Sequence, residues 1–371
     1  MSMSSPYIYI NAPLPKRFTP PEIVGEVELD AAGLCELMSV NDVGIASAGD
    51  GSVAERLLSV FSHPEVLFGD PTFIVANRQT WLDRLKVFVE KNEPVEFVAM
   101  AFPYKVPNPL KTDRQAPDLG EALMLRRLQA VLEAIGAVYS PGARLTILEE
   151  GILGRCQGVD PRRIAAYRAG IAGIAALSGI DSDRIRIHSL DDMVTSIPNF
   201  EARWIHEQER MRELWQQGDP DVRAAYTTTV AASRTSVPTF DYDPRVLAKA
   251  YDPEQTDSAL RYVRDYVDKV AHRQFFAYRS LLSLRDSTGY LHDLSPHALK
   301  LTVSPKPENL AVLPVNIWSR VLPYHGVPVL TAESRWEIAY LGTLGASYGR
   351  LEALHLTGDA DPRPIAYRAA E

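Results

Sequence analysis

The middle of the chain alternates short apolar runs with longer amphipathic stretches. The run at 94–102 is apolar and rich in β-branched and aromatic side chains, which is typical of a buried strand. An amphipathic stretch at about 119–138 has apolar residues at three- and four-residue spacing and predicts a helix. The two patterns then repeat as a strand at 144–149, a helix at about 161–178 and a strand at 184–188. This alternation predicts parallel strands joined by right-handed crossovers, which is a Rossmann-like core.

Charged helical segments follow this core at 199–217, 220–235 and about 254–284, and we expect them to form a cap over the rim of the sheet. Further along, the segments 298–304 and 310–315 have strand patterns and a short connection, which predicts an antiparallel hairpin added to the sheet. The predicted fold class is therefore α/β, with a Rossmann-like parallel core sheet, a helical cap and a late antiparallel hairpin.

The same patterns divide the chain into four parts. We expect an N-terminal extension with short helices at 1–75, the Rossmann-like core at 76–198, the helical cap at 199–290, and a C-terminal part at 291–371 that carries the hairpin and completes the core.

Composition narrows the class of protein. The 371 residues carry a formal net charge of −8, which argues against a general nucleic-acid surface. The two cysteines, Cys35 and Cys156, are far apart and offer neither a zinc spacing nor a disulfide framework. The N-terminus lacks the pattern of a signal peptide, and no apolar stretch reaches the length of about 18 residues that a membrane span needs. We therefore expect a cytoplasmic protein with neither nucleic acid nor membrane as a partner.

Common cofactor and metal motifs are missing. The sequence has no Gly-x-Gly-x-x-Gly after a strand, no Walker lysine motif, no nucleophile elbow and no His-Glu-x-x-His. We therefore expect no nicotinamide or flavin cofactor and no metal.

The loop after the first core strand is the leading candidate for a site. Four prolines within 103–117 hold it rigid. In an open α/β sheet, ligands bind at the carboxyl ends of the strands, and Lys105 and Asn108 lie there. Asp118 and Glu121 follow, with the spacing of a capping box at a helix start. A purely structural role as a helix cap is the alternative for these two carboxylates.

Three stretches of this region carry a family resemblance: Ala101-Phe-Pro-Tyr-Lys-Val-Pro-Asn108, Pro117-Asp-Leu-Gly-Glu121 and Leu125-Arg-Arg-Leu128. Together they resemble the signature of the isocyanide (isonitrile) synthases, the pyoverdine/dityrosine biosynthesis family. Pro323-Tyr-His-Gly326 is similar to the family's Pro-Trp-His-Gly. The resemblance covers roughly residues 75–330.

The resemblance implies an enzyme of secondary metabolism. Such an enzyme converts the amino group of an aromatic amino acid into an isonitrile, takes the carbon from ribulose 5-phosphate, and uses no metal or redox cofactor. The expected partners are therefore an amino acid and a sugar phosphate. A downstream oxygenase that acts on the product and a homodimer are both compatible with this assignment. The chemistry requires groups that move protons and cations that hold a phosphate.

Within this resemblance, the residues expected to be catalytic are Lys105, Glu121, Glu150 and His325. The residues expected to bind substrate are Asn108, Asp118, Arg126, Arg127, Lys300, Ser304 and Tyr324. Lys105 has two candidate roles: it holds an anionic group, or it forms an imine if burial lowers its pKa. Arg126 and Arg127 have a solvated helix face as their structural alternative.

Three departures from the family pattern leave alternatives open. Glu149-Glu150-Gly151 stands where the family commonly has Ser-Asp-Gly, and Ser304 stands where it has a histidine. A lysine of the family's following strand has no clear counterpart in 309–315. One alternative is a diverged enzyme that performs another carbon–nitrogen transformation on a different amine. The other is a binding module without catalysis.

Overall fold

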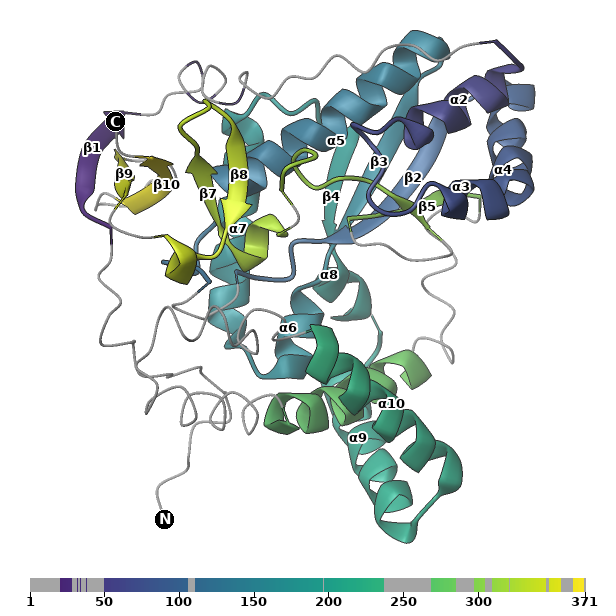
Figure 1. The fold of residues 1–371 in the computed structure, drawn as a ribbon. Coiled ribbons are helices and arrows are strands. Elements are labelled where there is room, and N and C mark those ends of the chain that lie inside the picture. Colours follow the sequence, from purple (N-terminus) through teal and green to yellow (C-terminus); the bar gives the residue numbers. More distant parts are fainter. Residues whose placement is uncertain are drawn as a thin grey trace.

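The computed structural model describes residues 21–28, 50–105, 111–195, 197–236, 268–284, 297–303, 309–319, 321–344, 347–354 and 363–369, and the single positions 32, 34 and 38. Within these residues the chain forms two five-stranded sheets (Figure 1). One sheet is parallel and central. The other is mixed and lies to one side of it.

The parallel sheet has the order β4-β3-β2-β5-β6. Its strands are β2 (Val95–Ala101), β3 (Ala143–Glu149), β4 (Ile185–Ser189), β5 (Leu299–Thr302) and β6 (Leu310–Ala311). All neighbouring pairs run parallel. The α/β class and the parallel core expected from the sequence are confirmed.

Helices cover one face of this sheet. α5 (Leu119–Val138) and α7 (Pro161–Leu177) are the crossovers, and α2 (Val53–Ser62), α3 (Thr72–Ala76) and α4 (Arg78–Lys91) complete the layer. Alternate strand residues, among them Phe97, Leu145 and Ile147, point into the core that these helices close. The other set of positions is less covered, since Met100 is 44% exposed.

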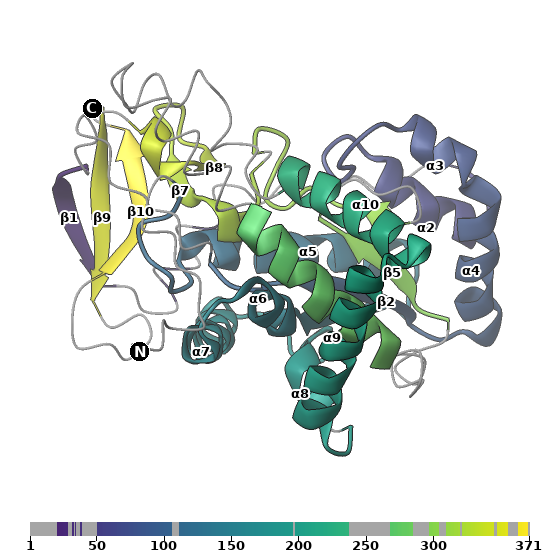
Figure 2. The same cartoon turned by 90° about the horizontal axis from the view of Figure 1, so that it is seen from below.

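A helical cap lies over the end of the sheet where the strands finish. It consists of α6 (Gly151–Gln157), α8 (Leu190–Thr195), α9 (Phe200–Gln217), α10 (Pro220–Ser236) and a helical segment at 268–284. Figure 2 shows α9, α10 and this last segment in front of the sheet. Trp204 on α9 donates a hydrogen bond of 2.8 Å to the carbonyl of Ala277, which joins two parts of the cap.

The second sheet was not expected from the sequence. Its order is β1-β9-β10-β7-β8, with β1 (Ile23–Glu28), β7 (Val327–Leu330), β8 (Trp336–Ala339), β9 (Tyr348–Leu354) and β10 (Arg363–Ala369). Two short 3₁₀ helices flank β7 and β8, at Pro323–His325 and Leu341–Thr343. The N-terminal strand β1 pairs in parallel with β9, so the sheet combines both ends of the chain.

The expected hairpin between 298–304 and 310–315 is wrong. β5 and β6 pair in parallel, with Leu301 opposite Leu310. β5 is aligned by its parallel pairing with β2, and a short connection does not by itself fix the direction of the next strand. An antiparallel hairpin does occur later in the chain, where Val327 on β7 faces Ala339 on β8.

No helix among the described residues is both long enough and apolar enough to cross a bilayer.

Candidate active site

The order of the parallel sheet points to one place for a ligand. From β2, the chain moves outward through β3 to β4 and later returns to add β5 on the other side of β2. Such a reversal of strand order opens a crevice at the carboxyl ends of the two strands. Lys105 follows β2 at this point. The segment that follows β5 contains Ser304, which lies outside the described residues, as does Asn108.

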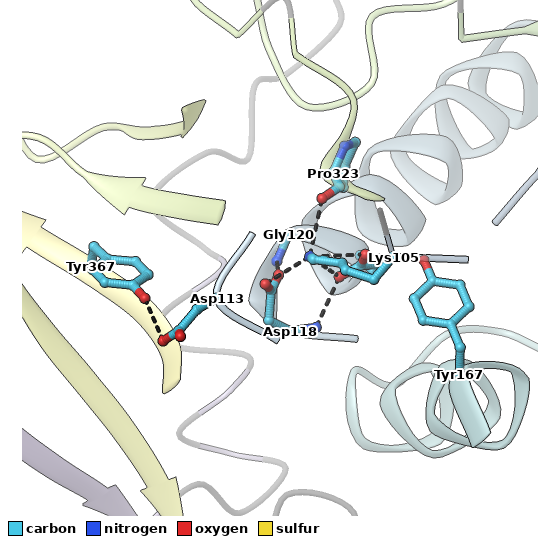
Figure 3. Close-up of polar contacts among 8 residues, drawn as sticks. Lys105, Asp113, Asp118, Gly120, Tyr167, Pro323 and Tyr367 are labelled. Atoms are coloured by element: carbon cyan, nitrogen blue, oxygen red, sulfur yellow. Dashed lines mark hydrogen bonds and ion pairs between the residues drawn. The ribbon is translucent and has the colours of Figure 1, made fainter. Parts of the chain in front are cut away.

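Lys105 is the centre of a buried ionic cluster (Figure 3). Its side chain is 1% exposed, and its Nζ lies 2.7 Å from Asp118 Oδ2 and 3.0 Å from Glu121 Oε1. It also donates a hydrogen bond of 3.0 Å to the carbonyl of Pro323. An ammonium group has three donor positions, and the two carboxylates and this carbonyl can use all of them. Lys105 therefore ties together three segments: the loop after β2, the start of α5 and the segment at Pro323.

Asp118 and Glu121 are at once a helix cap and partners of Lys105. The Asp118 side chain accepts a hydrogen bond of 2.8 Å from the Gly120 amide, and Glu121 Oε2 accepts one of 2.8 Å from the Asp118 amide. This is the capping box that the sequence spacing predicts. Tyr167 on α7 donates a further hydrogen bond of 3.0 Å to Glu121 Oε1. The predicted helix cap is confirmed, and the role of these carboxylates toward a substrate stays a prediction.

The cluster places one cation beside two carboxylates in a buried volume. Burial alone would lower the pKa of Lys105, but the attraction of Asp118 and Glu121 outweighs it, and the pKa stands above its ordinary value. Burial also raises the pKa of Asp118 well above its ordinary value, with Glu121 adding to the effect and Lys105 opposing it. Lys105 is therefore an ammonium ion. An imine-forming lysine needs a lowered pKa, so this candidate role of Lys105 is not supported.

Tyr324 and His325 form the neighbouring wall, immediately after the Pro323 carbonyl. The Tyr324 ring meets Phe102 edge-on, with 6.4 Å between ring centroids. Burial raises the pKa of Tyr324, and the charges of Glu150 and Glu121 add to this effect. Lys105, Asp118 and Glu121 are therefore brought together with the 323–325 segment.

His325 is neutral at physiological pH. Burial and the nearby ammonium groups of Lys111 and Lys105 lower its pKa to about 3. A neutral imidazole has one donor and one acceptor nitrogen, so His325 can orient a substrate by hydrogen bonding without carrying charge. Lys111 is buried at 3% exposure.

The second sheet supports the loop before α5. The Lys111 carbonyl accepts a hydrogen bond of 3.2 Å from the Leu341 amide. Asp113 accepts one of 2.8 Å from the hydroxyl of Tyr367 on β10. In Figure 3 these two residues lie on one side of the Lys105 cluster, and Tyr167 lies on the other. The site is thus built between the two sheets.

Some sequence-predicted residues lie elsewhere. Arg127 is buried on α5, where burial lowers its pKa and the carboxylate of Glu65 opposes that effect. Arg126 is only partly buried on the same helix. Lys300 is exposed, on the face of β5 opposite to the buried Leu299. Their expected role in substrate binding stays a prediction.

Glu149 is a candidate that the sequence reasoning missed, because it assigned the proton-moving role to Glu150. Glu149 is fully buried, and neither of its carboxylate oxygens has a hydrogen-bond partner among the described residues. The signal was present in the alternation of β3, since Leu145 and Ile147 point inward and Glu149 continues that series.

Within the described part of the chain, no group of three or more histidine, cysteine, aspartate or glutamate side chains is placed to hold a metal ion.

The fold and the site define an α/β protein with a polar, buried cluster at the strand-order reversal of a parallel sheet. Residues 85–339 match the model of the family described as pyoverdine/dityrosine biosynthesis protein. The chain belongs to this family, and the resemblance expected from its motifs is confirmed.

Named relatives agree with this assignment. The chain is 28% identical over 278 residues to the L-tyrosine isonitrile synthase of Pseudomonas aeruginosa, covering 71% of this chain and 80% of that protein. It is 37% identical over 123 residues to an L-tryptophan isonitrile synthase of Fischerella ambigua, which is 33% of this chain and only 37% of that protein. The expectation of an enzyme of the isonitrile synthase type is therefore confirmed.

The fold is also known from a crystal structure. The PvcA protein from Pseudomonas aeruginosa superposes with a TM-score of 0.57 at 22% identity, covering 85% of this chain and 99% of that one. At this identity the likeness shows the fold alone.

Proposed function

We propose that this protein is an isonitrile synthase that converts the α-amino group of an aromatic amino acid into an isonitrile, with ribulose 5-phosphate as the source of the carbon. The observation that carries the proposal is the similarity to the L-tyrosine isonitrile synthase over 80% of that protein. It is supported by the ionic cluster that the family motif builds around Lys105. The carbon source follows from the family resemblance.

In this proposal, Lys105 is a positioning residue. Its ammonium group is engaged by Asp118, Glu121 and the Pro323 carbonyl, so it fixes the distance between α5 and the Tyr324–His325 wall. Accurate placement of substrate-binding groups is itself a large contribution to rate.

His325 and Glu150 are the groups proposed to contact the substrates. A neutral His325 hydrogen-bonds to the sugar phosphate or to the imine formed from it, beside the positive charge of Lys111. Glu150, whose charge adds to the raised pKa of Tyr324, accepts protons as the carbon–nitrogen bond forms. Cytoplasmic location, a homodimer and a downstream oxygenase remain parts of the proposal.

The test is a labelling experiment. The purified protein is incubated with uniformly ¹³C-labelled ribulose 5-phosphate and a panel of aromatic and aliphatic amino acids, and products are analysed by mass spectrometry. We expect an isonitrile that carries one labelled carbon and forms from an aromatic amino acid. No isonitrile from any amino acid would overturn the proposed activity, and an unlabelled isonitrile would overturn ribulose 5-phosphate as donor.

A matched pair of variants tests the site. His325→Ala is expected to lower kcat at least tenfold. Lys86→Ala, an exposed position on α4, is expected to leave turnover unchanged. Equal turnover in both variants would place the site elsewhere.

A further inference from the structure

Two carboxyl groups at the rim of the parallel sheet have buried oxygens without a hydrogen-bond partner among the described residues. Glu149 ends β3, and Asp191 lies in the first turn of α8. Both carboxylate oxygens of Glu149 and the Oδ2 of Asp191 are buried and have no partner among the described residues. A buried ionised carboxylate without hydrogen bonds costs several kcal/mol, so this arrangement favours a protonated form.

The two groups converge on one point. A Cβ atom built on Gly151 would lie 2.9 Å from Glu149 Oε1 and 2.6 Å from Asp191 Oδ2. The same point lies 2.5 Å from a methyl group of Ile164 on α7. The glycine therefore keeps open a small space that a carboxyl oxygen of Glu149, a carboxyl oxygen of Asp191 and the apolar side chain of Ile164 all border.

The neighbouring cations are committed to other acceptors. Arg155 on α6 lies 3.9 Å from Asp191 Oδ1 and 2.6 Å from Glu201. Arg168 on α7 donates to the Ser189 hydroxyl and, at 3.2 Å, to Asp192. Among the described residues, no arginine makes a hydrogen bond to Glu149.

The electrostatics agree with the geometry. Burial, together with the charge of Asp191, raises the pKa of Glu149 to about 8, against the opposing effects of Arg168 and of the nearby Ser189 hydroxyl. Burial also raises the pKa of Asp191, while Arg155 and Arg168 oppose the shift and Asp192 adds to it. These are the charged groups that face the pair from α6, α7 and α8.

We propose that Glu149 and Asp191 share one proton at neutral pH and form an acid–base pair that exchanges protons at the rim of the active site. The proton moves between Glu149 and Asp191 Oδ2, and the partly exposed Asp191 exchanges it with solvent or substrate. Only O–H bonds form and break at the pair. The link to turnover rests on the proposed function, whereas the shared proton does not.

Other acids and bases at this rim fit such a role less well. Asp118 and Glu121 are held by Lys105, and His325, with a pKa of about 3, binds no proton near neutrality. Glu149 lies opposite Ala101, the last residue of β2, so the pair is at the same end of the sheet as the Lys105 loop.

Infrared titration of the full-length protein tests the shared proton without any substrate. Spectra are recorded from pH 5 to 10 for wild type, Glu149→Gln, Asp191→Asn and the control Asp192→Asn, which removes a largely exposed carboxylate next to Asp191. We expect a carbonyl band of a protonated carboxyl that disappears with a midpoint near pH 8 and is absent from Glu149→Gln. Labelling of wild type with ¹³C-glutamate is expected to shift this band, which assigns it even if the variant fails to fold.

Asp191→Asn tests the pairing itself. Loss of the neighbouring negative charge is expected to lower the midpoint by about one pH unit, and Asp192→Asn is expected to move it less. A wild-type spectrum without such a band, or an equal shift in the two aspartate variants, would overturn the proposal.

The pH dependence of isonitrile formation tests the link to turnover. In wild type we expect the rate of isonitrile formation to change with pH with a midpoint near pH 8. In Glu149→Gln we expect this pH-dependent limb of the rate profile to be lost, with kcat lowered at least tenfold and KM changed less than threefold. A retained limb in the variant overturns the link. Absence of product in wild type, with the infrared band present, refutes the proposed activity and leaves the shared proton standing.

Discussion

Two groups of buried carboxyls lie at the same end of the parallel sheet, and they differ in what surrounds them. Asp118 and Glu121 enclose an ammonium group, and hydrogen bonds connect them to Gly120, Tyr167 and the backbone. Glu149 and Asp191 both border the space beside Gly151, and three of their oxygens have no hydrogen-bond partner among the described residues. The first group is a fixed scaffold whose charges stabilise one another. The second is a group whose protonation responds to pH.

The largest expected effect comes from a substitution that removes the cation of the first group. Lys105→Met leaves the carboxyls of Asp118 and Glu121 buried without their cation. We expect a loss of about 3–5 kcal/mol in the free energy of unfolding, measured by urea denaturation, because a buried charge loses its partner. Lys86→Met, at an exposed position, is the control and is expected to change stability by less than about 0.5 kcal/mol. A loss of under about 1 kcal/mol in Lys105→Met would show that the cluster is not a scaffold.

The second prediction is a substitution that raises the stability of the folded protein instead of lowering it. The pKa of Glu149 in the folded protein, about 8, is above its ordinary value of 4.5, so the folded state binds the extra proton between these values. Wild type is therefore expected to lose stability, on the order of a few kcal/mol, as pH rises from about 5 to 8. Glu149→Gln removes this dependence, so the variant is expected to be more stable than wild type at pH 8. Urea denaturation at both pH values gives the comparison, and parallel pH curves for the two proteins would contradict it.

A smaller change probes the hydrogen bonds of the scaffold. Tyr167→Phe removes the donor to Glu121 but keeps the ring. We expect a loss of about 1 kcal/mol, since Glu121 retains its bond to Lys105. Double-mutant analysis of Tyr167→Phe with Glu121→Gln measures the coupling, and strictly additive effects would show that the contact contributes nothing.

The smallest expected effect concerns His325. Its pKa in the folded protein, about 3, is below its ordinary value of 6.5, so the unfolded chain binds the proton more readily. The associated stability is fully present above pH 6.5 and is lost as pH falls toward 3. At pH 6 the loss is less than about 1 kcal/mol. NMR of ¹⁵N-labelled histidine is expected to show His325 as neutral from pH 5 to 8, and a resonance that titrates near 6.5 would contradict this.

Patterns within short stretches of sequence predicted the strands and the helix start that are determined by neighbouring residues. The alternation of apolar runs gave β2, β3 and β4, and the Asp118–Glu121 spacing gave the start of α5 and the carboxylates that meet Lys105. The second sheet escaped because β1 pairs with β9, more than 300 residues away, and no local signal marks such a pairing. The direction of β6 was predicted wrongly for a related reason, since the length of a connection does not determine the direction of the next strand.

Prediction of the site failed where orientation matters. Glu149 and Glu150 are adjacent, and a strand sends adjacent side chains to opposite faces. The alternation of β3 already points to Glu149 as the buried carboxyl, but the sequence does not show that Ile164 and Asp191 pack beside it at Gly151. The state of Lys105 likewise depends on carboxylates that become its partners only in the folded protein.

The parallel pairing of β1 with β9 also has a consequence for synthesis of the protein. A ribosome releases residues 23–28 early, but their neighbours at 348–354 emerge only after nearly the whole chain has been translated. β2 likewise waits for β5, with the entire cap translated in between. Neither sheet can be completed during most of translation, so the apolar edges of β1 and β2 remain open to chaperones and to other nascent chains for that time.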